Sequence, residues 1–125
     1  MIRSVAARAV IALPLLACAC TVIQPVAVIG QHGDVLTGTT VATLSGGSFS
    51  AANGRLKCSG AYNSLSMAAT IQFTTLCSDG RKGFGTAVRD DTMEAGQGVI
   101  HMEDGETASF IFGAAAAIFT PKVGS

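Results

Sequence analysis

The segment Ser48-Phe-Ser-Ala-Ala-Asn-Gly-Arg-Leu-Lys-Cys-Ser59 decides the fold, because two alternating stretches flank a central Asn53-Gly54 dipeptide. Phe49 alternates with serines before the dipeptide, and Leu56 and Cys58 alternate with polar residues after it. Such alternation is typical of a half-buried β-strand. Asn-Gly favours a type I′ turn with positive φ at both central residues. The segment therefore predicts an antiparallel hairpin.

The same arrangement recurs twice further along the chain. Asp79-Gly80 and Asp104-Gly105 follow the first turn at spacings of 26 and 25 residues, and alternating stretches flank both. Three hairpins in series predict an all-β antiparallel meander of six strands, with 35–44 as a seventh strand at one edge. One apolar face must be buried, so we expect a curled sheet or small barrel, with a two-sheet sandwich as the alternative. The six predicted strands cover 48–51, 56–59, 71–74, 84–89, 98–102 and 108–112.

Strand parity assigns the apolar side chains to one face, which predicts the core. Thr, Ser, Lys and Arg dominate the other face. Glycines within the strands suit bends and bulges of a curved sheet. The predicted inward residues are Phe49, Leu56, Cys58, Tyr62, Ile71, Phe73, Phe84, Val88, Ile100, Met102, Phe110 and Phe112.

Two cysteines of the domain, Cys58 and Cys77, lie in adjacent predicted strands near the same end of the meander. If they face each other, the connecting loop centres on Met67-Ala68 and Tyr62 faces Phe73. An exported protein meets an oxidising compartment, where disulfides form. A metal site or a reactive thiol is the alternative, but neither cysteine has a further Cys or His at metal-ligand spacing. We expect a Cys58–Cys77 disulfide and no metal.

The N-terminus has the features of an export signal. Arg3 and Arg8 precede a short apolar run that ends in small residues. Leu15-Leu16-Ala17-Cys18 resembles a bacterial lipobox, which implies lipidation (palmitate) of Cys18 after removal of residues 1–17. Ala17-Cys18-Ala19 also fits an ordinary signal peptidase site, which would make Cys20 the mature N-terminus. An uncleaved anchor and a cytoplasmic start are the remaining alternatives.

The resemblance to Gram-negative lipoproteins carries a sorting rule, under which Ala19 after the modified cysteine implies the outer membrane. We expect residues 18–34 to be a lipidated N-terminus and tether, with an extra strand as the alternative, and 35–125 to be a single β domain. The lipid is the expected contact with the membrane.

Composition excludes some partners. Beyond residue 18, six basic and eight acidic side chains give a net charge of −2. No basic stripe is present, so we expect no nucleic-acid partner. No phosphate loop or Gly-x-Ser-x-Gly elbow occurs, and we expect no cofactor.

The run Leu56-Lys-Cys-Ser-Gly60, the stretch 76–83, Gly96-Gln-Gly98 and the closing Phe110-Ile-Phe-Gly113 together resemble a group of small Gram-negative bacterial lipoproteins. The resemblance spans about residues 46–113. It implies a shared fold and no particular activity. In size and location the chain is also similar to lipoprotein inhibitors of lysozyme, although no motif matches residue by residue.

Few residues are candidates for chemistry or contact. His101, beside Glu103 and Asp104, is an outward strand residue and a candidate catalytic base. His32 falls in the expected tether, and Asp90, Asp91 and Glu94 offer oxygen ligands without a known cation loop. The charged hairpin tips that carry Arg81, Lys82 and Glu103 are predicted to lie at the same end of the meander, where a partner could contact both.

We therefore expect a lipid-anchored envelope protein without catalytic residues, which acts as a binding or structural module for an envelope protein or glycan. The alternatives are a secreted hydrolase with a site around His101 and nearby carboxylates, and an inhibitor of a foreign hydrolase.

Overall fold

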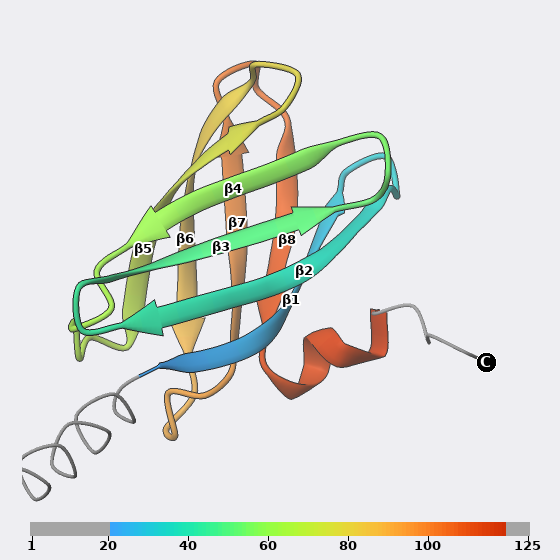
Figure 1. The fold of residues 1–125 in the computed structure, drawn as a ribbon. Helices are drawn as coiled ribbons and strands as arrows, with labels where there is room; N and C mark the ends of the chain where they lie inside the picture. Colours follow the sequence, from blue (N-terminus) through green and yellow to red (C-terminus); the bar gives the residue numbers. More distant parts are fainter. Residues whose placement is uncertain (1–20, 120–125) are drawn as a thin grey trace, which may run out of the picture.

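The computed structural model describes residues 21–119, which form a closed barrel of eight antiparallel strands followed by a short 3-10 helix (Figure 1). Each strand pairs with the next one along the chain, and the first pairs with the last. The predicted all-β antiparallel meander is confirmed, with eight strands in place of six or seven. The elements are β1 (Val22–Gly30), β2 (Val35–Thr43), β3 (Gly46–Ala52), β4 (Lys57–Tyr62), β5 (Thr70–Cys77), β6 (Lys82–Arg89), β7 (Gly96–Met102), β8 (Thr107–Phe112) and η1 (Ala114–Phe119).

The additional strand is β1, and it corrects the prediction of a tether over residues 18–34. β1 pairs with β2 on one side and with β8 on the other, from Val26↔Phe112 to Gly30↔Ala108. Val26, Ala27 and Val28 are all buried. The barrel interior and η1, which packs against β1, leave this segment little exposure. A strand buried on both faces shows no apolar–polar alternation, which is why the sequence pattern failed here.

Proline at position 25 does not break the β1 ladder. The carbonyl of Pro25 accepts a hydrogen bond from the N–H of Gly113, so the hydrogen-bonding groups of this residue point toward the β8 side. In an antiparallel sheet, the N–H and the C=O of one residue point toward the same neighbouring strand. An N–H at Pro25 would also point toward β8 rather than β2, so its absence costs no hydrogen bond between β1 and β2. On the other side, β8 ends at Phe112, the partner of Val26, and so does not reach Pro25.

Inward aromatic rings lie over inward glycines of the neighbouring strand, and this pairing shapes the core. A Cβ atom at Gly85 would lie 2.2 Å from the ring of its register partner Phe73. The corresponding distances in the pairs Gly47–Tyr62, Gly60–Phe49 and Gly96–Phe112 are 2.3, 2.7 and 2.7 Å, which also leave no room for a Cβ atom. The rings of Phe49, Phe73 and Phe110 then meet at centroid distances of 4.5 to 5.4 Å.

The same pairing corrects two predicted core residues. Phe84 and Val88 are 51% and 56% exposed, and Gly85 and Ala87 of β6 face the interior instead. Phe73 fills the space over Gly85, so a large inward side chain at that point of β6 has no room. The other ten predicted inward residues belong to the core or pack against it.

The turns sit where the dipeptides predicted them, but their type differs. Gly54, Gly80 and Gly105 have φ of 92 to 95°, whereas the Asn or Asp before each does not have positive φ. At the β5–β6 turn the N–H of Gly80 donates to Cys77 O at 2.9 Å, and the N–H of Cys77 donates to Arg81 O at 2.9 Å. This pattern is a type I turn followed by a left-handed glycine. The expectation of type I′ turns was therefore wrong.

The Cys58–Cys77 disulfide is present, and the two cysteines are register partners of β4 and β5. Tyr62 faces Phe73 in the same ladder, as predicted. Both cysteines point into the barrel and are almost fully buried. The signal peptide, Cys18 and Cys20 lie outside the described residues. Within residues 21–119, no helix has the length and apolar character needed to cross a bilayer.

Candidate functional site

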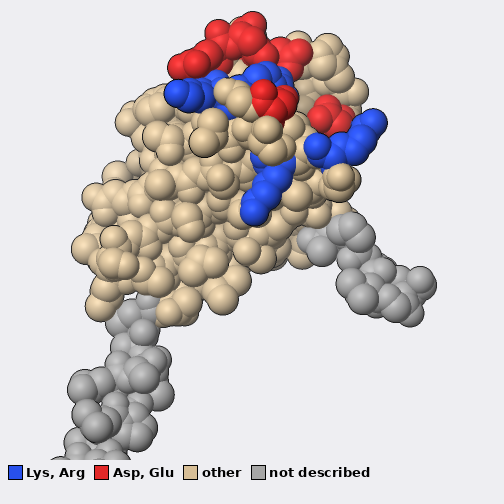
Figure 2. Space-filling model, turned by 45° about the horizontal axis from the view of Figure 1, so that its top comes forward, with Lys and Arg blue, Asp and Glu red and all other residues tan. Residues whose placement is uncertain are grey.

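The two ends of the barrel differ in chemistry. The β1–β2, β3–β4, β5–β6 and β7–β8 turns lie at one end, here called the charged end. The start of β1 and the β2–β3, β4–β5 and β6–β7 connections lie at the other, here called the open end. Figure 2 shows acidic and basic side chains gathered over one end, with few charges on the barrel wall in that view.

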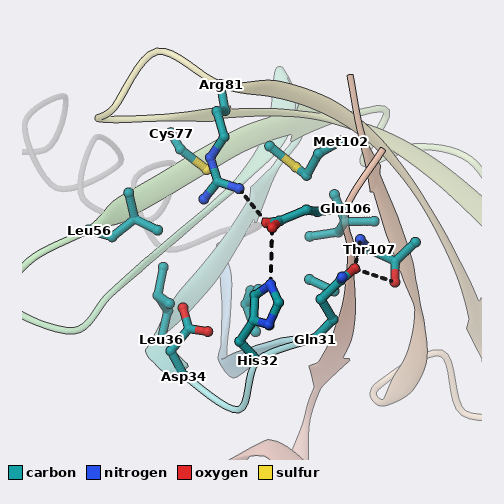
Figure 3. A pocket seen from close by; sticks show the side chains of 14 residues that line it. Gln31, His32, Asp34, Leu36, Leu56, Cys77, Arg81, Met102, Glu106 and Thr107 are labelled. Atoms are coloured by element: carbon teal, nitrogen blue, oxygen red, sulfur yellow. Dashed lines mark hydrogen bonds and ion pairs between the residues drawn. The ribbon is translucent and has the colours of Figure 1, made fainter. Parts of the chain in front are cut away.

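Arg81 organises the charged end. Its Nε donates to Asp79 Oδ2 at 2.9 Å, and its Nη1 lies 2.8 Å from Glu106 Oε1 and 3.4 Å from Asp104 Oδ2. His32 Nε2 lies 3.1 Å from the other carboxylate oxygen of Glu106. Figure 3 shows Glu106 between Arg81 and His32, above the mouth of a small pocket. The β5–β6 and β7–β8 hairpin tips lie at the same end, as predicted, and Arg81 joins them through ion pairs that the sequence did not predict.

These ion pairs close the charged end. The pocket beneath them has a volume of about 50 Å³, which is room for a few water molecules. Hydrogen bonds to Asp79 raise the pKa of Arg81, and the N–H of Arg81 lowers the pKa of Asp79 below its ordinary value. Both groups are therefore charged at neutral pH, and the end is held shut by internal pairs.

The remaining predicted residues of this end lie on its surface. Lys82 and Glu103 are exposed and joined through the backbone, since the N–H of Glu103 donates to Lys82 O at 2.8 Å. His101 is exposed on the outer face of β7, opposite Phe84 and Thr107 in the neighbouring strands. No side-chain hydrogen bond or ion pair reaches His101 from the described residues 21–119. The structure thus assembles no acid–base pair there.

The open end contains the larger cavity, with a volume of about 330 Å³. Volumes of this size are typical of sites for small molecules. Aromatic rings from β3, β5 and β8 form its floor, and the connections at the open end surround its mouth. The side chains that line it are Val22, Gln24, Thr40, Ala42, Phe49, Tyr62, Ser64, Ser66, Met67, Ile71, Phe73, Arg89, Thr92, Met93, Glu94, Phe110 and Phe112.

Several polar groups of the cavity are held in place by hydrogen bonds. The hydroxyls of Tyr62 and Thr40 share a hydrogen bond of 2.7 Å within the wall. At the mouth, Arg89 Nε donates to Ala68 O at 3.1 Å and Nη2 donates to Ser66 O at 2.9 Å. These bonds hold the guanidinium between the end of β6 and the β4–β5 loop. Among the described residues Arg89 forms no ion pair, although Glu94 also lines the mouth.

A strained residue also borders the cavity. Met93 has φ of 63°, in the left-handed region that non-glycine residues rarely adopt. Its N–H donates to Asp90 O at 3.0 Å, and Asp90 Oδ1 accepts hydrogen bonds from both the N–H and the hydroxyl of Thr92. The hydroxyl of Thr92 is the main reason that the pKa of Asp90 is lowered. The β6–β7 turn therefore has a strained backbone at Met93, and the side chain of this residue lies at the mouth of the cavity.

Asp90, Asp91 and Glu94 do not form a metal site. Within the described part of the chain, no three His, Cys, Asp or Glu side chains are grouped so as to hold a metal ion. Asp90 instead accepts hydrogen bonds that shape its own turn. A structural role thus accounts for this carboxylate.

Sequence reasoning missed the open-end cavity and expected an interior filled by packing. The missed signal lies in the small inward residues of β2 and β3. Ala42 faces the interior near the end of β2, and Gly47 is its register partner in β3. Alternation identified the inward face, but only the barrel geometry shows that the side chains on it leave space at this end.

A scan against protein-family models, a search of curated proteins and a search of solved structures found no match to this chain.

Proposed function

We propose that this protein is a lipid-anchored module of the cell envelope that binds a small amphipathic molecule in the open end of its barrel. The observation that carries the proposal is the cavity of about 330 Å³. Its floor is aromatic, so an apolar group placed there is removed from water. Such burial stabilises a complex by about 0.8 kcal/mol for each CH₂ group.

Arg89 gives the proposed ligand a polar end. Its guanidinium is held at the mouth by two backbone carbonyls and has no carboxylate partner among the described residues. Arginine binds carboxylate and phosphate groups through paired N–H donors. The favoured ligand therefore has an apolar chain inside the barrel and an acidic headgroup at Arg89.

The test measures binding of a dye whose fluorescence rises in apolar sites, followed by its displacement with fatty acids and fatty alcohols of matched chain length. Replacing Ala42 by Phe fills the cavity from β2. We expect affinity to fall about tenfold or more, which corresponds to about 1.4 kcal/mol for each factor of ten. The matched control is Thr39→Phe, because Thr39 is exposed on the outer face of the same strand.

The headgroup assignment is tested separately with Arg89→Gln. We expect the variant to lose its preference for the acid over the alcohol while it still binds the alcohol. A general loosening of the β4–β5 loop would instead weaken both ligands equally. Equal dye binding in Ala42→Phe, Thr39→Phe and the wild-type protein contradicts the proposed site.

Anchoring is tested by labelling cells with a radioactive fatty acid. We expect Cys18→Ala to abolish incorporation and Cys20→Ala to leave it intact, because Leu15 stands at the lipobox position before Cys18. Label that survives in Cys18→Ala and disappears in Cys20→Ala reverses the assignment. A wild-type protein without label contradicts the lipid anchor, and fractionation of the labelled cells tests the outer-membrane location.

A further inference from the structure

The connections at the open end carry exposed apolar side chains that the barrel core does not use. Ile23 at the start of β1, Leu44 in the β2–β3 turn, and Leu65 and Met67 in the β4–β5 loop are 61 to 78% exposed. We call these four residues the apolar rim. Figure 1 shows that the start of β1 and the β2–β3 and β4–β5 connections, which carry these residues, lie at the same end of the barrel, and Met67 also lines the cavity. Exposed apolar patches mark interaction surfaces, including those for membranes.

Charge separates the rim from the opposite end. The β2–β3 turn and the β4–β5 loop contain no charged residue, whereas every turn at the charged end contains at least one. Of the charged residues in the described part of the chain, only Arg89, Asp90, Asp91 and Glu94 lie at the open end. A surface with an apolar rim at one end and most of its described charges at the other fits a molecule that stands at a boundary between hydrocarbon and water.

The chain itself supplies the second argument. β1 begins at Val22 on the open end, only four residues after Cys18. Four residues of fully extended chain span at most about 14 Å. An acylated Cys18 therefore holds the open end within the reach of the lipid headgroups, and the charged end cannot take its place.

We infer that the apolar rim is seated on the lipid bilayer, so that the cavity opens directly onto the membrane. The partner is the bilayer surface itself. This inference rests on the proposed anchor at Cys18, but it does not depend on which ligand the cavity holds. A ligand drawn from the membrane then enters the barrel without crossing water.

The rim should prefer neutral lipids. Arg89, Asp90, Asp91 and Glu94 together carry a net charge of −2 beside it. Basic clusters strengthen binding to anionic membranes, and this end has none. Apolar insertion thus holds the rim on the bilayer, and anionic lipid should not deepen it.

The absence of tryptophan from the chain permits a direct test. A single introduced tryptophan reports its own surroundings in the full-length acylated protein, reconstituted into phosphatidylcholine vesicles that carry bromine on the acyl chains. Leu65→Trp places the reporter on the rim. Arg55→Trp places it in an exposed turn of the charged end, and Phe84→Trp places it on the exposed barrel wall.

We expect Leu65→Trp to lose most of its emission to bromine quenching and to shift to shorter wavelength, with little change in the two controls. Anionic lipid added to the vesicles should not increase the quenching. Quenching of Phe84→Trp or Arg55→Trp equal to that of Leu65→Trp overturns the inference, because the barrel then lies on its side or inverted. No quenching at Leu65→Trp also overturns it, and a blue-shifted but unquenched Leu65→Trp with a cross-linked dimer assigns the rim to a second copy of the chain.

The outcome is separable from that of the proposed function. Dye binding in detergent reports the cavity without any bilayer, and the Ala42→Phe and Thr39→Phe pair tests it there. Normal dye binding with no quenching at Leu65→Trp overturns only the seating. Strong quenching without dye binding keeps the seating and contradicts the cavity as a ligand site.

Discussion

The charged end and the open end are built from the same eight strands, yet the first holds a small pocket and the second a much larger cavity. At the charged end, every turn has four residues between strand bounds. At the open end, the β4–β5 and β6–β7 connections have seven and six. The enclosed volumes are about 50 and 330 Å³. At the charged end, Arg81 of the β5–β6 turn links three carboxylates, whereas the open end combines these longer loops with the two-residue β2–β3 connection and retains the larger cavity.

The difference between the two ends shows that the turns and loops at the ends of this barrel, rather than its wall, separate a small pocket from a larger cavity. The wall supplies one inward apolar face along its whole length. Polar side chains from three different turns cover the charged end, whereas small inward residues such as Ala42 and Gly47 leave space at the open end.

Phe110→Ala should destabilise the protein most, by about 3–5 kcal/mol. The ring of Phe110 contacts those of Phe49, Phe73 and Phe112, so it joins the floor of the open cavity to the rest of the core. Urea denaturation measures the change. The control is Phe84→Ala, which deletes the same ring from the exposed wall and should cost much less. Similar losses in the two variants would contradict the core assignment.

Removal of the disulfide by the double substitution Cys58→Ala and Cys77→Ala should cost about 2–5 kcal/mol, because the bond restricts the unfolded chain. Cys77 also lines the small pocket at the charged end. Hydrogen exchange should therefore rise near the β3–β4 and β5–β6 turns. Dye binding at the open end should persist under conditions where the variant is folded. Loss of binding with the fold intact would show that the two ends are coupled.

Thr75→Val should stabilise the protein by about 1 kcal/mol. The hydroxyl of Thr75 is buried and has no hydrogen-bond partner in the described residues, and valine has nearly the same shape. Leaving a buried polar group unpaired is unfavourable, and its removal recovers that cost. Thermal unfolding of Thr75→Val beside Thr70→Val, at an exposed position of the same strand, measures the effect. A destabilised Thr75→Val would indicate a partner such as bound water.

Protonation of Asp79 in acid should slightly lower the free energy of unfolding of the protein. The folded pKa of Asp79 is lowered by the N–H of Arg81, so its contribution is fully present above the unfolded value of about 3.9 and is lost as the pH falls through the folded value. Asp79→Asn keeps an acceptor for the turn but should lack this part of the pH dependence. Its stability relative to wild type, measured from neutral pH to about pH 2, should rise below pH 4. A constant difference would contradict the assignment.

Local patterns predicted most of the wall and the charged end. Alternation and the Gly54, Gly80 and Gly105 turns identified the three hairpins, and the meander then placed Cys58 opposite Cys77. All of these features involve residues in one hairpin or in neighbouring strands. The position of the β5–β6 and β7–β8 tips at the same end followed from the same topology.

The features that sequence reasoning missed depend on distant or three-dimensional contacts. β1 lost its alternation because η1 covers its outer face, and η1 comes from the far end of the chain. The inward side of β6 was assigned to Phe84, since nothing local shows that the ring of Phe73 occupies the space over Gly85. The open cavity depends on how side chains of several strands meet, which parity along one strand does not report.

β1 is synthesised before the other strands of the barrel, but one of its two partners is β8, the last strand, as in the pair Val26 and Phe112. β1 must therefore wait for nearly the whole domain before this second partner arrives. Until then the sheet has two unpaired edges, which are sites of association with other chains. Closure over so long a separation is also slow, because loop entropy must be overcome first. Before β1 pairs with β8, the open sheet therefore exposes edges for association that the finished barrel no longer has.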